Sequence, residues 1–184
     1  MDKATLRREA LARRDSIPEK QRKMAEAYMT ERIIGHQWFY LAETVLIFVS
    51  YKTEINTMEI IEEAWNKRKK VYAPKIIDGR MEFFRIYSKK DLQEGYKGIL
   101  EPIDENEKFE YRASEMDKTL MLMPGVAFDR FYHRIGYGKG FYDCYLSKYP
   151  ELRNKTIAIG FKCQLVEDFE PDEFDIKPYQ VILC

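Results

Sequence analysis

The sequence predicts an α/β fold, namely a three-layer α/β/α sandwich with a mainly parallel sheet and an inserted β-hairpin. Segments typical of strands alternate with segments typical of helices through much of the 184 residues, as a parallel sheet requires. The runs 44–49 and 120–128 are almost continuously apolar, which is typical of strands buried on both faces. No repeat or flexible linker interrupts the chain, so we expect one domain over residues 1–184.

The first part of the chain indicates two helices and a strand. Residues 3–14 read as a basic helix with its apolar side chains on one face. Residues 16–19 have the spacing of a capping box, and we expect a second helix from there to Ile34, ended by Gly35. The run 44–49 follows as the first buried strand.

The middle of the chain indicates the inserted hairpin. A helix is expected from a cap at residues 56–57 to about Lys70. Residues 71–74 read as a short strand that Pro74 stops, and Asp78 and Gly79 mark the turn before a returning strand. The remaining expectations are a returning strand over 81–87, loop over most of 91–118, a strand over 120–128, a helix over about 141–148, and strands over 156–161 and 180–184.

Composition excludes several classes of protein. Lys plus Arg equals Asp plus Glu at 31 each, so no overall field favours nucleic acid or an anionic membrane, and we expect neither as a partner. The three cysteines are scattered and there are only two histidines, which argues against a multi-histidine zinc site and suits a reducing cytoplasm. The N-terminus carries no signal-peptide pattern. We expect a cytoplasmic protein that is a monomer or a weak homodimer.

A glycine-rich segment carries most of the functional information. Gly136, Gly138 and Gly140 alternate between a buried strand and the start of a helix, flanked by Arg134 and Lys139. Glycines let successive N–H groups turn towards one anion, and a helix N-terminus favours negative charge. The alternative is a tight loop that only joins strand to helix. The flanking charges favour a site for a polyphosphate.

An acid beside this segment points to a metal ion. Asp143 falls in the first turn of the expected helix, where its carboxylate would repel phosphate unless a cation lies between them. Mg²⁺ takes one or two protein carboxylates together with phosphate oxygens, and Asp172 or Asp175 could supply the second. The alternative for Asp143 is a charge that favours the helix dipole; for the later acids it is a solvated turn.

Two cations lie one helical turn apart near the N-terminus. Lys3 and Arg7 occupy one face of the first expected helix, where like charges at this spacing repel each other slightly. A shared anion would explain the arrangement, although spacing alone favours a solvated helix face.

The chain resembles the 5-formyltetrahydrofolate cyclo-ligase family over nearly its whole length and in order. Residues 123–146, with RIGYGKGFYD at 134–143, look like the family signature. Residues 3–7 resemble its N-terminal nucleotide-binding element, and residues 50–57 are similar to its folate-binding segment. Residues 98–102 and 171–175 fall where the family has matching elements.

The resemblance implies roles for particular residues. It implies that ATP is bound by Lys3, Arg7, Arg134, Gly136, Gly138, Lys139, Gly140, Phe141 and Tyr142, and Mg²⁺ by Asp143 and Asp172. It implies that the folate is bound by Val49, Glu54, Tyr137, Gly138, Lys139, Gly140 and Phe141. Lys139, Arg134 and Tyr142 are the catalytic residues expected on this basis.

Two residues depart from the family pattern. Phe141 stands where the family usually has tyrosine, so a hydroxyl is lost while the ring remains. Tyr132 stands where glycine is common, so the turn over residues 131–133 is expected to differ in shape.

The reaction implied by the resemblance converts 5-formyltetrahydrofolate and ATP into 5,10-methenyltetrahydrofolate, ADP and phosphate, with Mg²⁺. Two other classes stay open on the residues alone. One is an α/β enzyme that binds a single phosphate on the glycine loop without ATP or Mg²⁺. The other is a binding module that uses the basic N-terminal helix on nucleic acid, with a steep salt dependence.

Overall fold

A six-stranded sheet in the order β10-β9-β6-β1-β2-β3 forms the centre of the computed structural model, which describes residues 2–103 and 106–184. Every neighbouring pair is parallel except β2 and β3, which form the inserted antiparallel hairpin. The predicted fold class is thereby confirmed. The sheet strands are β1 (Thr44–Ile47), β2 (Lys70–Ile77), β3 (Arg80–Arg85), β6 (Thr119–Met123), β9 (Thr156–Gly160) and β10 (Gln180–Leu183).

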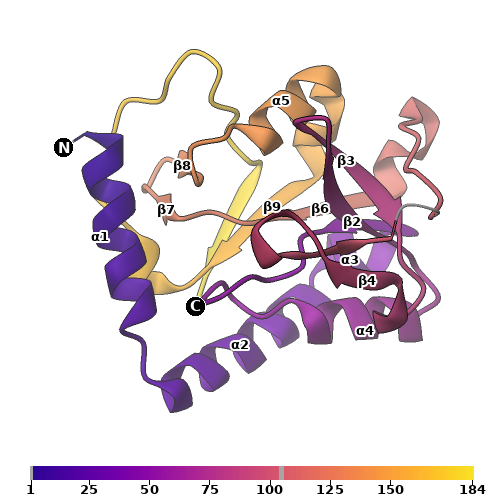
Figure 1. Cartoon of the computed structure of the whole chain (residues 1–184), viewed down its shortest axis with the longest axis horizontal. Helices are drawn as coiled ribbons and strands as arrows, with labels where there is room; N and C mark the ends of the chain where they lie inside the picture. Colours follow the sequence, from indigo (N-terminus) through magenta and orange to yellow (C-terminus); the bar gives the residue numbers. More distant parts are fainter. Residues whose placement is uncertain (1, 104–105) are drawn as a thin grey trace.

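Alternate residues of the strands fill two separate cores. In β1, Val45 and Ile47 pack with helices α2 (Glu19–Ile34), α3 (Gln37–Leu41) and α4 (Met58–Asn66). Leu46 points to the other face, where α5 (Phe141–Lys148) and the short helix η4 (Pro150–Lys155) pack. The same alternation runs through β6 and β9. This two-sided burial explains why the strands read as continuous apolar runs, and Figure 1 shows the helices on either side of the sheet.

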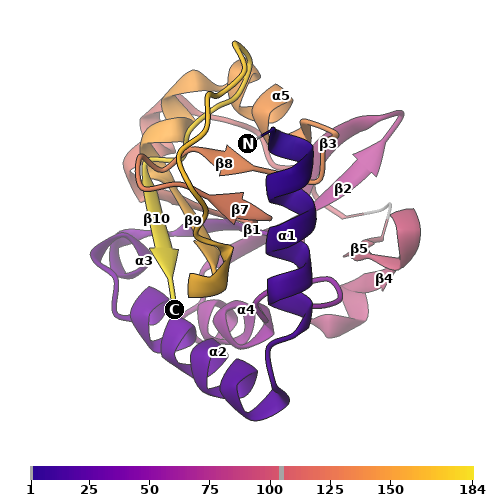
Figure 2. The same ribbon diagram turned by 90° about the vertical axis from the view of Figure 1, so that its left-hand side faces the viewer.

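Helix α1 (Lys3–Asp15) stands apart from both layers and packs on a small hairpin. Leu6 and Ala10 form a third apolar cluster with the strands β7 (Ala127–Phe128) and β8 (Arg134–Ile135) and with Phe169. Figure 2 shows α1 upright in front of β7 and β8, with α2 leading away from its foot. The N-terminal helix therefore lies against the segment that leads into the glycine loop.

Several expected boundaries were wrong. Pro74 does not stop β2, which continues to Ile77, because β1 pairs with β2 only as far as Tyr72 and the proline needs no N–H towards that side. The helix expected to reach Lys70 ends at Asn66. Ser16 does not cap α2: its hydroxyl donates to Arg13 instead.

Other segments carry structure that the sequence did not indicate. The expected loop over 91–118 contains a small antiparallel hairpin, β4 (Leu92–Glu94) with β5 (Leu100–Pro102), and the short helices η2 (Tyr96–Gly98) and η3 (Ala113–Lys118). Residues 104 and 105 of that stretch lie outside the described residues. The run 120–128 is broken after Met123, so that β7 leaves the sheet and pairs with β8. The other short helices are η1 (Lys89–Asp91) and η5 (Lys162–Gln164).

The strand order reverses direction between β1 and β6. From β1 the chain moves outward to β2 and β3, whereas from β6 it moves the opposite way to β9 and β10. Ligands of open parallel sheets bind beyond the carboxyl ends of strands at such a point. The segments that follow Ile47 and Met123 are therefore where the fold places a site. No helix within residues 2–103 and 106–184 is long and apolar enough to cross a membrane.

Candidate active site

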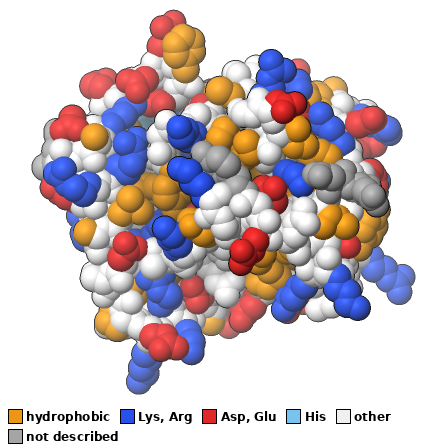
Figure 3. Space-filling model, in the orientation of Figure 1, with side chains coloured by type: hydrophobic (Ala, Val, Ile, Leu, Met, Phe, Trp, Pro, Cys, Tyr) orange, Lys and Arg blue, Asp and Glu red, His pale blue; other side chains and the backbone are white. Residues whose placement is uncertain are grey.

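A cleft of about 310 Å³ opens beyond the carboxyl ends of β1 and β6. Its floor includes Phe48 and Val49, which follow β1, and Pro124 and Gly125, which follow β6. Figure 3 shows apolar side chains gathered near the centre of this face with basic side chains beside them. An apolar cleft with a few polar groups is the usual form of a small-molecule site. The predicted site residues that line it are Val49, Glu54, Arg134, Gly136, Tyr137, Lys139, Gly140, Phe141, Tyr142 and Asp143.

Arg134 forms the charged corner of the cleft. Its Nη2 lies 3.0 Å from Oδ1 of Asp143, and its side chain is buried. The same carboxylate oxygen accepts a hydrogen bond of 3.1 Å from the backbone N–H of Ile176. Nε of Arg134 is buried without a hydrogen-bond partner among the described residues. The guanidinium therefore keeps a donor for a further acceptor, and an incoming anion would supply one.

The glycine loop has the backbone that its composition predicts. Gly138 and Gly140 adopt φ of 91° and 65°, a region that costs side-chain-bearing residues strain. A Cβ on Gly136 would lie 2.9 Å from Nη1 of Arg134, so this glycine lets the guanidinium lie against the loop. Gly140 directly precedes α5, whose first N–H groups face the loop. The loop is thus shaped for an anion.

Helix α1 brings Arg7 to the glycine loop and Lys3 to the later loop that contains Asp172. Nε of Arg7 donates to the carbonyl oxygen of Gly136 at 2.8 Å. Lys3 forms ion pairs with Asp172, at 2.7 Å, and with Asp175. Neither basic side chain lines the cleft itself, nor do Gly138 and Asp172. They lie at its outer edge, where the loop that contains Asp172 crosses the N-terminus of α1.

Tyr142 places a buried hydroxyl at the cleft. This hydroxyl has no hydrogen-bond partner among the described residues, although a buried tyrosine O–H normally has one. Burial raises the pKa of Tyr142 well above its usual value, and the negative charge of Glu54 raises it further. The group stays protonated at neutral pH and can donate to a ligand in the cleft.

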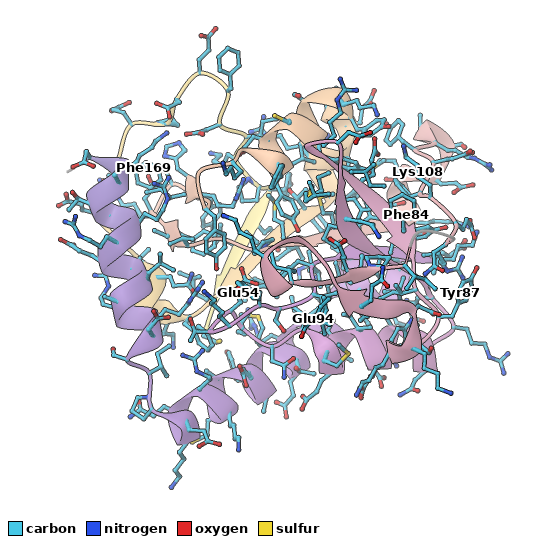
Figure 4. The ribbon with its side chains drawn as sticks, in the orientation of Figure 1. Glu54, Phe84, Tyr87, Glu94, Lys108 and Phe169 are labelled. Carbon is cyan, nitrogen blue, oxygen red and sulfur yellow. The ribbon has the colours of Figure 1, made fainter. Side chains whose placement is uncertain are left out.

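Glu54 is a buried acid in the lining of the cleft. It is 9% exposed, and its Oε2 accepts a hydrogen bond of 2.9 Å from the backbone N–H of Tyr51. Burial raises the pKa of Glu54, while the hydrogen bonds from Tyr51 and Tyr137 and the charge of Arg14 oppose that rise. Figure 4 shows Glu54 inside the molecule, between α1 and the β4 segment. A buried carboxylate facing a cleft is suited to accept N–H groups of a ligand.

Some residues that shape the site were missed by sequence reasoning. The buried side chain of Gln164 donates to the carbonyl oxygens of Gly125 and Val126 and accepts from the N–H of Phe161, which holds the chain break after β6. Thr57 holds the chain after β1 in a similar way. Its hydroxyl donates to the carbonyl oxygen of Phe48 and accepts from the backbone N–H of Ser50. In the sequence each of the two is an ordinary polar residue, and spacing does not reveal that the fold buries it.

Lys75 is one of the buried charged residues of the protein. Its ammonium group is buried, 2.8 Å from the carbonyl oxygen of Pro102 and 3.6 Å from Glu101. Glu101 lines the cleft. A Cβ at Gly95 would lie 1.9 Å from Cδ of Glu101, so this glycine makes room for the acid.

The donor set fits Mg²⁺ at one carboxylate. Asp143 lines the cleft beside the glycine loop, and its Oδ2 accepts no hydrogen bond from the described residues, which leaves a hard oxygen for a cation. Among the described residues no three acids, histidines or cysteines gather as a closed metal site, so phosphate and water would complete the coordination. The positive charge of Arg134 acts on the carboxylate of Asp175. Asp175 directly precedes Ile176, whose backbone N–H donates to Asp143. Asp172 as the second ligand stays a prediction.

The fold and the cleft define an α/β class of protein with a glycine-rich loop at the switch point of a parallel sheet. The sequence matches the model of the 5-formyltetrahydrofolate cyclo-ligase family over residues 1–183. The chain therefore belongs to that family, and it is an enzyme of this class.

Relatives with known names agree with this placement. The 5-formyltetrahydrofolate cyclo-ligase of Escherichia coli K12 is 31% identical over 171 residues, which cover 89% of this chain and 90% of that protein. The mouse enzyme of the same name is 28% identical, with 98% and 92% covered. The solved structure of 5,10-methenyltetrahydrofolate synthetase from Aquifex aeolicus superposes with a TM-score of 0.82 at 26% identity, and covers 97% of this chain and 87% of that one.

Proposed function

We propose that this enzyme converts 5-formyltetrahydrofolate to 5,10-methenyltetrahydrofolate, with ATP and Mg²⁺ as requirements and ADP and phosphate as products. One observation supports this most: a single cleft has a cationic, glycine-rich wall and also a buried acid, Glu54, in its lining. A polyphosphate and a polar heterocycle need groups of these two kinds. Family membership supports the folate as substrate.

The cationic wall suits phosphoryl transfer. That chemistry depends on positioning and on neutralising charge more than on covalent catalysis. Within the described part of the chain Arg134 has a buried donor without a partner, Lys139 lines the cleft, and Gly136 and Gly140 of the loop line it as well. Asp143 would hold Mg²⁺, which when bound neutralises part of the phosphate charge. Lys3 and Arg7 would contact the outer end of ATP.

The proposed chemistry activates the formyl group. The formyl oxygen attacks the γ-phosphorus of ATP, the bond to the β-phosphate oxygen breaks, and ADP leaves. The resulting iminium phosphate carries an electrophilic carbon. The N10 amine attacks that carbon, closes a five-membered ring and loses its proton, and the carbon–oxygen bond breaks to release phosphate. The hydroxyl of Tyr142, which is buried without a hydrogen-bond partner among the described residues, would donate to the formyl or phosphoryl oxygen.

The part of the cleft that contains Glu54 would bind the folate. Glu54 accepts N–H groups of the pterin through its carboxylate, and Val49 packs beside it on the floor. Tyr137 and Phe141 close over the reacting group from the glycine loop. The loss of the family tyrosine at Phe141 leaves a ring for stacking but removes a hydroxyl there, so Tyr137 and Tyr142 supply the tyrosine hydroxyl groups of this segment.

A spectrophotometric assay tests the proposal. Purified protein is mixed with 5-formyltetrahydrofolate, ATP and Mg²⁺, and the absorbance of the methenyl product is followed near neutral pH. We expect product only when all three are present. Full turnover after removal of ATP with an ATP-consuming enzyme would overturn the mechanism, and binding of phosphate without any folate turnover would favour the single-phosphate alternative.

A further inference from the structure

Arg14 connects helix α1 to both walls of the cleft, although it lines neither. We propose that Arg14 is a positioning residue that holds Tyr137 and the Glu54 carboxylate in place for the folate. The inference rests on the proposed function, because it assigns Glu54 to folate binding. It concerns a side chain that lies eleven residues beyond Lys3 on the same helix, within the core of the protein.

The contacts of Arg14 reach two segments that are far apart in the sequence. Its Nη2 donates to the hydroxyl oxygen of Tyr137 at 2.9 Å, and its guanidinium carbon lies 5.9 Å from the centre of that ring. Its Nε donates to Oγ1 of Thr53 at 3.1 Å. Thr53 directly precedes Glu54, so one guanidinium joins the glycine loop to the turn that carries the acid.

The turn before Glu54 is clamped from the same corner of the molecule. Nη1 of Arg22 donates to the carbonyl oxygen of Thr53 at 2.7 Å, and its Nη2 donates to the carbonyl oxygen of Arg14 at 2.6 Å. The hydroxyl of Thr53 donates to Asp15. Within this turn Lys52 adopts φ of 53°, a conformation that surrounding contacts must hold in place. The junction of α1 and α2 therefore fixes the position of Glu54.

The charge of Arg14 matters as well as its shape. Arg14 is 2% exposed, and its Nη1 has no hydrogen-bond partner among the described residues. Burying a cation is costly unless an anion balances it. The positive charge of Arg14 favours the ionised form of Glu54, and the Tyr137 hydroxyl donates to the same carboxylate. Arg14 thus acts on Glu54 both directly and through Tyr137.

The groups that face Glu54 come from several elements. Arg14 belongs to α1, Tyr137 to the glycine loop and Tyr142 to α5. The other charged side chains that line the cleft are Lys97, Glu101, Arg134, Lys139 and Asp143. Tyr137 and Tyr142 both have a raised pKa, chiefly through burial, and stay neutral at pH 7. Of the described groups that favour the Glu54 carboxylate, Arg14 is the one that brings a full positive charge, and it does so from outside the cleft lining.

The test compares Arg14→Met, Arg14→Lys, Tyr137→Phe and the double variant Arg14→Met/Tyr137→Phe with wild type. Arg13→Met is the matched control, because Arg13 is the exposed neighbour on α1. The kcat/KM for 5-formyltetrahydrofolate is measured from pH 5 to 9 at saturating ATP and Mg²⁺. The KM for ATP is measured at one pH, and circular dichroism checks the fold.

We expect the acid limb of the folate profile to move to higher pH by about one unit in Arg14→Met, because losing a nearby positive charge makes Glu54 easier to protonate. Arg14→Lys should move it less, and the KM for ATP should stay within about twofold of wild type. The double variant should lose less than the product of the single losses, since both side chains act on one carboxylate.

A folded Arg14→Met protein with the wild-type pH profile would overturn the inference, as would a rise in the KM for ATP with the folate parameters unchanged. Multiplicative losses in the double variant would also contradict it. If Arg14→Met does not fold, Arg14→Lys and Tyr137→Phe carry the same comparison. Absence of turnover in wild type would instead reject the proposed function, so the two failures are distinguishable.

Discussion

Tyr132 carries a side chain in a backbone conformation that favours glycine. It adopts φ of 69° at the tip of the β7–β8 hairpin, and its N–H donates to the carbonyl oxygen of Asp129. The side chain is 45% exposed. A residue with a Cβ is destabilised by roughly 1–2 kcal/mol in this region of φ. The turn therefore has a backbone conformation that favours glycine, although the residue there is tyrosine.

Tyr132→Gly should therefore stabilise the protein. We expect the free energy of unfolding to rise by about 0.5–1 kcal/mol, because relief of strain exceeds the extra chain entropy of glycine. Urea unfolding followed by tryptophan fluorescence measures it. Tyr132→Ala keeps the Cβ and serves as the control. If glycine is no more stable than alanine at this position, backbone strain is not the determining factor.

At the scale of elements, the sequence predicts what local pattern encodes. The six strands of the central sheet and helices α1, α2, α4 and α5 were all expected, although the bounds of β2, β6 and α4 differ from those predicted. The failures have a tertiary cause. Pro74 is tolerated because β1 has already ended beside it, and β7 turns away from β6 because Gln164 binds the carbonyl groups exposed at the break. Neither β1 nor Gln164 is close in sequence to the segment whose structure it determines.

Helix α1 offers a prediction at this scale. Arg7 donates to the carbonyl oxygen of Gly136, so it both supports the glycine loop and brings charge to its outer edge. Arg7→Ala should raise the KM for ATP several-fold and lower the free energy of unfolding by about 1 kcal/mol or less, since one partly exposed hydrogen bond is lost. Steady-state kinetics and urea unfolding measure the two effects.

Arg8→Ala is the matched control for that experiment. Arg8 is the exposed neighbour of Arg7 on the same helix, so its loss removes one charge without touching the loop. We expect its KM for ATP to remain near that of wild type. An equal rise in both variants would show that the helix contributes only general positive charge. An unchanged KM for ATP in Arg7→Ala would show that this face of the helix is solvated and does not bind ATP.

At the scale of the whole molecule, the site depends on contacts that local pattern cannot predict. The glycine loop and Asp143 were found from residue types in one segment. That Lys3 meets Asp175 and that Arg7 meets Gly136 follows from the fold, which joins residues 172 and 129 positions apart. Spacing alone favoured a solvated face for α1, and only the family resemblance assigned it to ATP. The support of Glu54 by Arg14 had no sequence signal, because a buried arginine looks like an exposed one.

The last prediction concerns how ligands stabilise the whole protein. A ligand that binds only the folded state adds stability with concentration, about 2.7 kcal/mol at one hundred times its Kd. ATP with Mg²⁺ should therefore raise the Tm of wild type by several degrees, and by more than ATP with EDTA. Asp143→Asn should lower the Tm without ligand, because it leaves the buried Arg134 without its ion-pair partner, a loss of about 3 kcal/mol. That fall reports the ion pair and not the metal.

The metal role is read from the increment that Mg²⁺ adds to the effect of ATP. In Asp143→Asn this increment should largely vanish, since an amide is a poorer ligand for a hard cation. Asp172→Asn is the comparison, because Asp172 is exposed and pairs with Lys3, so its substitution should leave the Tm without ligand nearly unchanged. If Asp172 is the second ligand, its variant also loses part of the increment. A full Mg²⁺ increment in Asp143→Asn would show that this carboxylate serves Arg134 alone.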